Sequence, residues 1–253
     1  MANNYLSYIS DEHLMSCIRR LYNSYVKAKN QISKSKFYSN KVDTIKLTFD
    51  SKFNDLNEET FIKSEISRQI DKSINNAIGT FHEEILGGID GYEKGNLDGY
   101  DIKASDNTLF ADIKNKHNTM NSGATESLYQ KLSKFAENYP NSECYWVQIW
   151  ATKSFNVHWS GKINGKQYNH ERVNKISGDQ FYKLLSKHDT ALKDLYDVLP
   201  RAINDFLETL EDEEEVEESS AFEEISQSAQ KNNRSIINQI TFDNFNYYLG
   251  FDK

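Results

Sequence analysis

A chain of 253 residues with 38% hydrophobic and 27% charged residues can bury a sizeable core and has an ordinary soluble composition. It shows no run of membrane-spanning length, no signal-peptide pattern in its first 20 residues, and only two distant cysteines, so we expect a cytoplasmic protein. The net charge of −8 argues against nucleic acid only at first sight, because residues 205–224 hold eleven acids and no base, and without them the chain would carry +3.

The N-terminal third is predicted to be mostly helical and basic. Apolar residues at helical spacing indicate a helix over 11–30. Residues 31–57 are polar and irregular, apart from a strand-like stretch at 42–50. A second helical region begins with Asn57 as its N-cap and ends at Gly87. The stretch from Arg19 to Lys46 is basic; such a run is more often a solvated face than a phosphate-binding surface, so both interpretations stay open.

The middle of the chain predicts a sheet with helices around it. Two signals for this sheet are the clearest. One is the strongly apolar stretch at 144–152, which is typical of a buried strand, and the other is the Asn-Gly dipeptide at 164–165, which favours a tight hairpin turn. The C-terminal tail is aromatic and strand-like. The expected elements are strands at 100–104, 108–114 and 144–152, a hairpin within 155–177, helices at 124–138, 178–188 and 190–210, and the tail at 235–253.

The first two strands form a hairpin whose register can be derived from the alternation of side chains. If Asp106 and Asn107 are a two-residue loop, paired residues have numbers that sum to 213, and Tyr100, Ile102 and Ala104 face the apolar residues Ile113, Ala111 and Leu109. On the other face Asp101 then lies across from Asp112, with Lys114 one pleat away. The Cβ atoms of Asp101 and Asp112 would be about 5 Å apart, the usual cross-strand distance.

Two carboxylates at that distance repel each other unless a cation lies between them, and a hard divalent ion such as Mg²⁺ is the natural one. A lysine beside them could orient or deprotonate a water molecule or stabilise charge on a phosphate. The pattern therefore predicts a metal-dependent phosphodiesterase, although an Asp-x-Lys on an exposed hairpin face is common without any role. Asp98 is a second candidate for the first metal ligand.

These residues resemble a known family. The segments GYDI (99–102) and ADIKNKHNTMNS (111–122) are similar to the PD-(D/E)XK nuclease motif, and more narrowly to type II restriction endonucleases that cut GGNCC or GGWCC sites. FHEEILG (81–87) and ISGDQFYKLL (176–185) also resemble that group, so the resemblance runs from about residue 78 to about 205. Tyr100 stands where the motif has proline, and the second acid is Asp rather than the commoner Glu.

The resemblance implies an α/β restriction-endonuclease-like core, a mixed central sheet flanked by helices, with helical N-terminal and C-terminal additions. It implies a Mg²⁺-dependent enzyme that cleaves double-stranded DNA as a homodimer, alongside a cognate methyltransferase. The residues that match the motif's two acids and its lysine are Asp101, Asp112 and Lys114. An upstream helical Glu often adds a metal or water contact in this superfamily, and Glu83 is our candidate, although a solvated helix turn is an equal alternative.

Further candidates are polar residues that follow the catalytic strand or lie on the next helix. Side chains such as Asn and Lys can contact base edges or phosphates. The expected DNA-binding residues are Asn115, Lys116, His117, Asn118, Asn121, Gln130 and Lys131, with Lys116 and Asn118 preferred. The loop at 161–172 carries four basic residues and could enter a groove as a β-ribbon. Trp146, Trp150 and Trp159 are expected in the core.

We expect one domain over 1–253. Within it, a basic helical part (1–75), a catalytic core (78–205), an acidic segment (206–230) and a strand-like tail (231–253) follow each other. Two alternatives remain. One is a non-specific or repair-type nuclease on the same scaffold, and the other is a non-catalytic DNA-binding protein whose acidic block mimics DNA.

Overall fold

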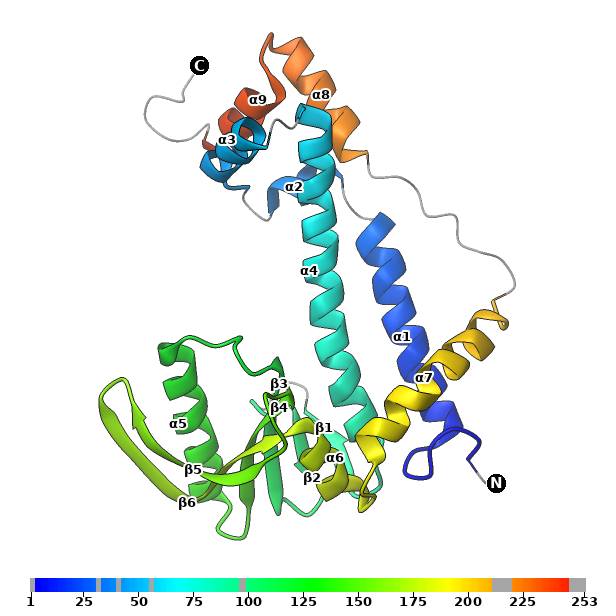
Figure 1. The fold of residues 1–253 in the computed structure, drawn as a ribbon, viewed down its shortest axis with the longest axis vertical. Coiled ribbons are helices and arrows are strands. Elements are labelled where there is room, and N and C mark those ends of the chain that lie inside the picture. Colours follow the sequence, from blue (N-terminus) through cyan, green and yellow to red (C-terminus); the bar gives the residue numbers. More distant parts are fainter. Residues whose placement is uncertain are drawn as a thin grey trace. The chain divides into compact units, whose positions relative to one another are not determined.

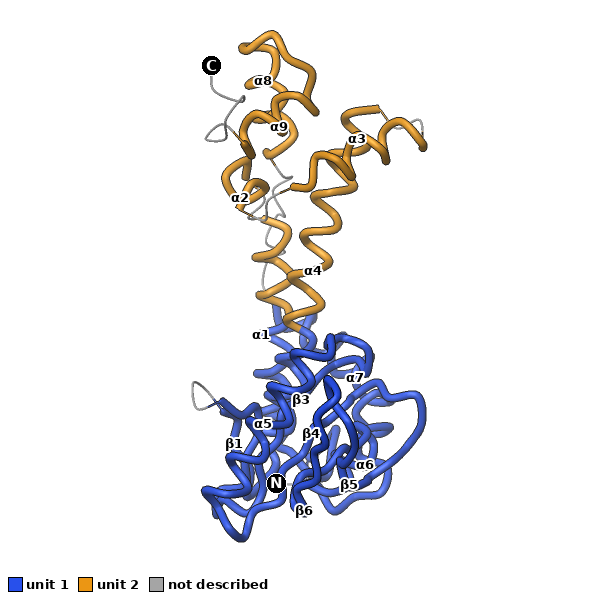
Figure 2. The backbone as a smooth tube through the Cα atoms, turned by 90° about the vertical axis from the view of Figure 1, so that its left-hand side faces the viewer, with its two compact units in different colours: residues 1–21, 78–211 blue, residues 22–77, 212–253 orange. Residues whose placement is uncertain are grey.

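The computed structural model describes residues 3–30, 33–39, 42–54, 57–95, 99–210 and 220–245. The chain divides into two compact units, coloured separately in Figure 2: unit 1 contains residues 1–21 and 78–211, and unit 2 contains residues 22–77 and 212–253. Helices α1 (Asp11–Asn30) and α4 (Glu58–Gly87) each contribute residues to both units. None of the described helices is long and apolar enough to cross a membrane. Whether both units fold as the single domain expected above stays a prediction.

Unit 1 is built around a six-stranded mixed sheet with the strand order β1-β2-β3-β4-β6-β5 (Figure 1). β3 pairs in parallel with β4, and β4 with β6, while the remaining pairs are antiparallel. The strands are β1 (Tyr92–Lys94), β2 (Ile102–Ala104), β3 (Leu109–Lys116), β4 (Glu143–Trp150), β5 (Asn156–Ile163) and β6 (Lys166–Ser177). The other helices of the unit are α5 (Ser122–Asn138), α6 (Gly178–Ser186) and α7 (Ala191–Leu207).

Helices cover both faces of this sheet. α5 packs Leu128 and Leu132 into one cluster with Trp146 of β4. α6 places Phe181 against Tyr145, which precedes Trp146 in β4, and the two ring centroids are 6.1 Å apart. Successive residues of a strand point to opposite faces, so α5 and α6 lie on opposite sides of the sheet. The expected mixed sheet flanked by helices is confirmed.

The predicted hairpin is confirmed together with its register. Ile102 pairs with Ala111, and Lys103 pairs with Phe110, so both pairs have numbers that sum to 213. Asn107 has a φ of 60°, as a tight turn between the two strands requires. The second hairpin is also confirmed: Asn164 and Gly165 join β5 to β6 with φ values of 50° and 79°.

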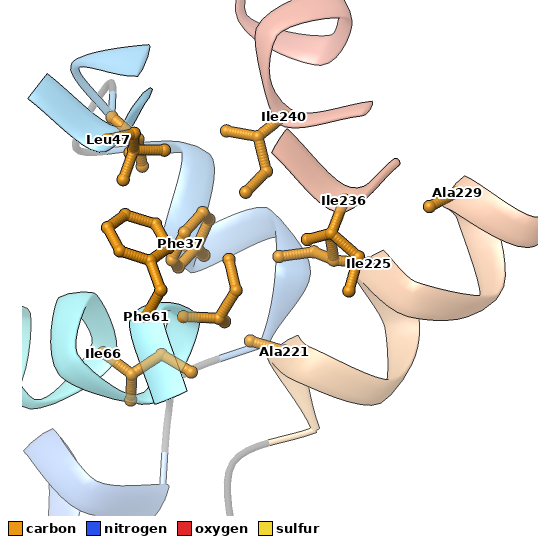
Figure 3. Packing of buried hydrophobic residues seen from close by; sticks show 11 residues of the cluster. Phe37, Leu47, Phe61, Ile66, Ala221, Ile225, Ala229, Ile236 and Ile240 are labelled. Carbon is orange, nitrogen blue, oxygen red and sulfur yellow. The ribbon is translucent and has the colours of Figure 1, made fainter. Parts of the chain in front are cut away.

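Unit 2 is helical. The helices that belong only to this unit are α2 (Lys34–Ser39), α3 (Thr44–Phe53), α8 (Ala221–Lys231) and α9 (Ile236–Phe245). Its core gathers apolar side chains from α2, α3, α4, α8 and α9 (Figure 3). Phe37, Phe61, Ile225 and Ile240 meet there.

Two strand predictions in this unit were wrong. The stretch 42–50 forms most of α3, because the Asp43 carboxylate caps the helix by accepting hydrogen bonds from the amides of Ile45 and Lys46 at 3.0 and 3.1 Å. Of the three apolar residues that alternate in this stretch, Leu47 is buried on one face of the helix, whereas Ile45 and Phe49 are exposed. The C-terminal tail was expected as a strand, but its described part is α9, which buries Ile236 and Ile240.

One further prediction about the sheet needs correction. Trp146 and Trp159 are buried as expected, but the side chain of Trp150, at the end of β4, is 60% exposed, and its indole donates a hydrogen bond to the Tyr196 hydroxyl.

β1 was not predicted at all, because three residues are too few to show an alternation. Asn57 caps α4 as predicted, since its side chain accepts a hydrogen bond from the Thr60 amide at 2.8 Å.

Candidate active site

The centre of the candidate site is a buried carboxylate on β3. Asp112 is only 3% exposed, so it cannot be a solvated residue on an open hairpin face. The neighbouring strand positions Asp101 through the backbone: the Asp101 amide donates to the Ala111 carbonyl at 2.9 Å, and the Asp101 carboxylate accepts from the Ile113 amide at 2.6 Å. The observed pairing of β2 with β3 ends at Ile102↔Ala111, and the Asp101 amide bonds to the carbonyl of that same Ala111, so the direct pairing of Asp101 with Asp112 stays a prediction.

Two lysines neutralise Asp112 from different elements. The Lys114 ammonium, on the same strand face, lies 2.5 Å from Asp112 Oδ1, and Lys131 of α5 contacts Oδ2. The contact of Lys114 is an ion pair without hydrogen-bond geometry, and this ammonium donates instead to the Ile113 carbonyl at 3.3 Å. Oδ1 is therefore a buried acceptor that receives no hydrogen bond from the described residues. Lys131, which was expected to contact DNA, thus forms an ion pair with Asp112, a candidate metal ligand.

The acids of the site influence each other electrostatically. Burial raises the pKa of Asp101, and the negative charge of Asp112 raises that pKa further. Burial also raises the pKa of Glu83 on α4, and the charge of Asp101 adds to the shift, which places Glu83 near the acid pair. Glu83 forms an ion pair with Lys94 of β1 at 3.5 Å. Sequence reasoning missed Lys94, because nothing marks β1 as a strand.

The two neighbours of Glu83 on α4 have other partners. His82 is buried and lies 2.9 Å from the Tyr182 hydroxyl of α6, and its burial lowers its pKa to about 4. Glu84 forms an ion pair with Arg20 of α1 at 2.9 Å. The charge of Asp101 raises the pKa of Glu83, while the contact of Glu83 with a metal or its water stays a prediction.

The acid pair has the donor chemistry of a magnesium site. Among the described residues no group of three or more His, Cys, Asp or Glu side chains gathers to enclose a metal. Mg²⁺, however, usually takes only one or two carboxylates and completes its shell with water and substrate phosphate oxygens. Asp101 and Asp112, with the buried Oδ1 that accepts no hydrogen bond, fit such an open site. The alternative ligand Asp98 lies outside the described residues.

The polar residues at the end of β3 have mixed surroundings. Lys116 and Asn118 are exposed. Asn115 is half-buried, and its side-chain oxygen has no partner among the described residues. His117 is exposed, but its amide and its ring nitrogen both lie 3.2 Å from the Trp150 carbonyl, so it also fastens β3 to β4. The two exposed side chains are therefore the freest to contact a ligand.

Two predicted DNA-binding residues take part in local structure. The Asn121 side chain caps α5 by accepting a hydrogen bond from the Ala124 amide at 2.8 Å. Gln130 donates to the Tyr168 hydroxyl at 3.3 Å and to Glu126 at 3.5 Å. It therefore lies beside the β5–β6 hairpin, and its described hydrogen bonds do not involve Asp101 or Asp112.

The β5–β6 hairpin is fastened to α5 by one carboxylate. Glu126 accepts hydrogen bonds from Tyr168 at 2.5 Å, Asn164 at 2.7 Å and Lys166 at 3.0 Å, and these bonds lower its pKa to about 2. Arg172, another basic residue of this hairpin, donates to three backbone carbonyls around the end of α5. Part of the basic charge expected to face DNA is thus used to hold the hairpin on the fold.

Comparison with known proteins agrees with this geometry. The model of the Eco47II restriction endonuclease family matches residues 6–208. The chain is 42% identical over 265 aligned residues to the type II restriction enzyme Sau96I of Staphylococcus aureus, covering 99% of this chain and 100% of that enzyme. It is 29% identical over 208 residues to the type II restriction enzyme Eco47II of Escherichia coli, covering 78% of this chain and 86% of that enzyme.

The similarity extends beyond the segment in which the motifs were recognised. It reaches back through the N-terminal helices, which were thought to add little to the resemblance. A family match over most of the chain, together with a relative aligned over its full length, decides the assignment. The chain therefore belongs to the Eco47II family of type II restriction endonucleases, the site-specific deoxyribonucleases of restriction–modification systems.

Proposed function

We propose that this enzyme hydrolyses both strands of DNA in a Mg²⁺-dependent reaction at a short palindromic, G/C-rich site, GGNCC or GGWCC. The observation that carries the proposal is the buried Asp112 between two lysines, with Asp101 on the neighbouring strand. The recognition sequence rests on the resemblance of residues 111–122 to enzymes that cut such sites. We further propose that the enzyme acts in the cytoplasm beside a methyltransferase that protects the host's own sites.

In this proposal each residue of the site has a separate task. Asp101 and Asp112 hold the divalent ion, and Glu83 contributes a further contact to the ion or its water. A bound Mg²⁺ supplies Lewis-acid polarisation of the phosphate and a more acidic water molecule. Lys114 orients or deprotonates the attacking water and stabilises negative charge that develops on the phosphate. Lys131 holds the Asp112 carboxylate in place from α5.

Contacts to DNA are proposed for the exposed residues that leave β3. Lys116 and Asn118 are exposed at the end of the strand, and Asn115, His117 and Asn121 lie near them in sequence. Phosphate contacts set the register of the protein on the duplex, and base contacts set the sequence. Gln130 is proposed as a more distant contact from α5.

Incubation of a sequenced plasmid with the purified enzyme tests the proposed function. With Mg²⁺ we expect discrete fragments whose ends all map to GGNCC or GGWCC, and with EDTA we expect intact plasmid, because removing the ion removes the catalyst. A smear of fragments would indicate a non-specific nuclease instead. Intact plasmid in Mg²⁺ would support a non-catalytic DNA-binding protein.

We also propose that the enzyme acts as a homodimer. A palindromic site is matched most simply by a two-fold protein assembly, in which each subunit cuts one strand. The aromatic tail at 240–251 is a candidate for the contact through residues other than Ile240, which is fully buried inside unit 2. Light scattering should give twice the mass of the chain, free or on an uncleavable duplex. A monomer under both conditions would reject the dimer.

A further inference from the structure

One lysine beside the candidate active site has no counter-charge among the described residues. The Lys175 ammonium of β6 lies 5.1 Å from the ring centroid of Trp146 and 4.9 Å from that of Trp159. No carboxylate of the described residues forms an ion pair with it. The residue is half-buried, and its burial lowers its pKa. Within the part of the chain that the structure describes, Lys175 is therefore a partly desolvated cation held by two aromatic faces.

The sheet places this lysine on the same face as the candidate catalytic residues. Asp112 pairs with Trp146 of β4, and Trp146 pairs with Lys175 of β6, so the three residues form one row across three strands. Strands in a sheet are about 4.8 Å apart, and Lys175 is two strands from Asp112, which makes the separation of their Cα atoms roughly 10 Å. The side chains of Lys175 and Asp112 therefore lie on the same face of the sheet.

The environment of Lys175 costs stability unless an anion compensates for it. A partly buried ammonium loses hydration, and the attraction of an indole ring returns only about 0.5–2 kcal/mol. The two indoles fix the direction of the ammonium, and no described carboxylate is paired with its three N–H donors. Such a site is poised for an acceptor with negative charge that arrives from outside the protein, and the substrate of this family is a polyanion.

We propose that Lys175 binds a phosphate of the DNA strand close to the scissile bond, with Trp146 and Trp159 holding its ammonium in position. Each strand of B-DNA carries one phosphate per about 3.4 Å along the axis, so a separation of roughly 10 Å corresponds to about three phosphates. The contacted phosphate therefore lies within about three nucleotides of the one at Asp112. The distance to the scissile bond rests on the proposed function, which puts that bond at the acid pair.

Lys175→Met tests the contact, because methionine keeps an unbranched side chain between the indoles and removes only the charge. Binding is measured in EDTA on two duplexes of equal length, one with GGACC and one without it. We expect a loss of affinity of roughly tenfold on both duplexes, as for one lost charged hydrogen bond. The slope of log K against log salt should become shallower by about 0.9, the value for one phosphate. Lys175→Arg should restore both values.

The matched control is Lys183→Met, which removes an exposed lysine from α6 on the opposite face of the sheet and should leave affinity and slope unchanged. The melting temperature of Lys175→Met should equal or exceed that of the wild type, because an uncompensated charge is removed. A lower melting temperature would indicate a structural lysine and overturn the proposal. Unchanged affinity and slope, or a loss confined to the GGACC duplex, would overturn it as well.

The result is independent of the proposed chemistry. Because binding is measured without a metal, the outcome for Lys175 does not depend on whether Asp101 and Asp112 are the ligands. If Asp112→Asn cleaves DNA normally, the assignment of the active site fails. The phosphate contact of Lys175 would then still be decided by the affinity and the salt slope alone.

Discussion

Asp112→Asn should abolish cleavage while the protein continues to bind its DNA site. The substitution removes one of the two carboxylates that are proposed to hold the metal, whereas the expected phosphate and base contacts lie elsewhere. It also removes the counter-charge of Lys114 and Lys131, whose side chains are 33% and 36% exposed and can turn toward water. Cleavage is measured in Mg²⁺, and binding is measured in Ca²⁺. Full activity of Asp112→Asn would reject this residue as a ligand.

Asp101→Asn provides a better-folded companion to this variant. The amide oxygen of asparagine can still accept the hydrogen bond of the Ile113 amide. Because the pKa of Asp101 is raised in the folded protein, its ionised form is less favourable there than in the unfolded chain. Stability is therefore lost as the pH rises from the unfolded to the folded pKa, and the full penalty is present at neutral pH.

The companion variant should thus be inactive and melt at or above the wild-type temperature at pH 7 without metal. The difference in melting temperature between the two proteins should shrink at low pH, where Asp101 is protonated in both states. If Asp98→Asn is inactive while Asp101→Asn cleaves, then Asp98 is the first ligand and the interpretation of the hairpin acids is wrong.

Lys114→Ala should reduce the single-turnover cleavage rate by roughly 10²- to 10³-fold, the usual effect of losing one electrostatic stabiliser of a transition state. Its ammonium lies 2.5 Å from Asp112 Oδ1, which places it beside the proposed metal and its water. A lysine with only a solvated structural contact would contribute about 0–1 kcal/mol and would not change the rate by such a factor. The variant should melt near the wild-type temperature and bind its site in Ca²⁺.

Lys116→Ala is the matched control, because Lys116 lies on the same strand face two residues further along and is exposed. It should weaken DNA binding and flatten the salt dependence, while the single-turnover rate at saturating enzyme stays close to that of the wild type. If Lys114→Ala cleaves within a few-fold of the wild-type rate at saturating Mg²⁺, the catalytic role of this lysine fails.

The register of the β2–β3 hairpin was predictable because one pairing sets Ile102 and Ala104 of the first strand against Ala111 and Leu109 of the second. The structure has that pairing, from Ile102↔Ala111 to Lys103↔Phe110. A slip of one residue would have set these apolar side chains against polar positions of the partner strand, so the alternation favours one register. The turn at Asn164-Gly165 was predictable for a similar reason, since few residues tolerate a positive φ.

Contacts made by packing were not predictable. The ion pair of Lys131 with Asp112 depends on where α5 lies over β3, which local pattern does not encode. Lys94 reaches Glu83 from a strand of three residues, too short to show a period. α3 has apolar residues at alternating positions, but the cap by Asp43 and the burial of Leu47 in unit 2 decide for a helix. Tertiary context overrides local propensity in these cases.

The position of the bound metal tests the central claim most directly. Crystals of the enzyme with an uncleaved duplex and Mn²⁺ in place of Mg²⁺ would locate the ion by its anomalous scattering. We predict a peak within about 2.0–2.2 Å of one carboxylate oxygen of Asp101 and one of Asp112, the coordination distance of such a hard cation. The Lys114 ammonium should lie beside the same water shell. A peak that contacts Asp98 but not Asp101, or no peak at Asp112, would contradict the account.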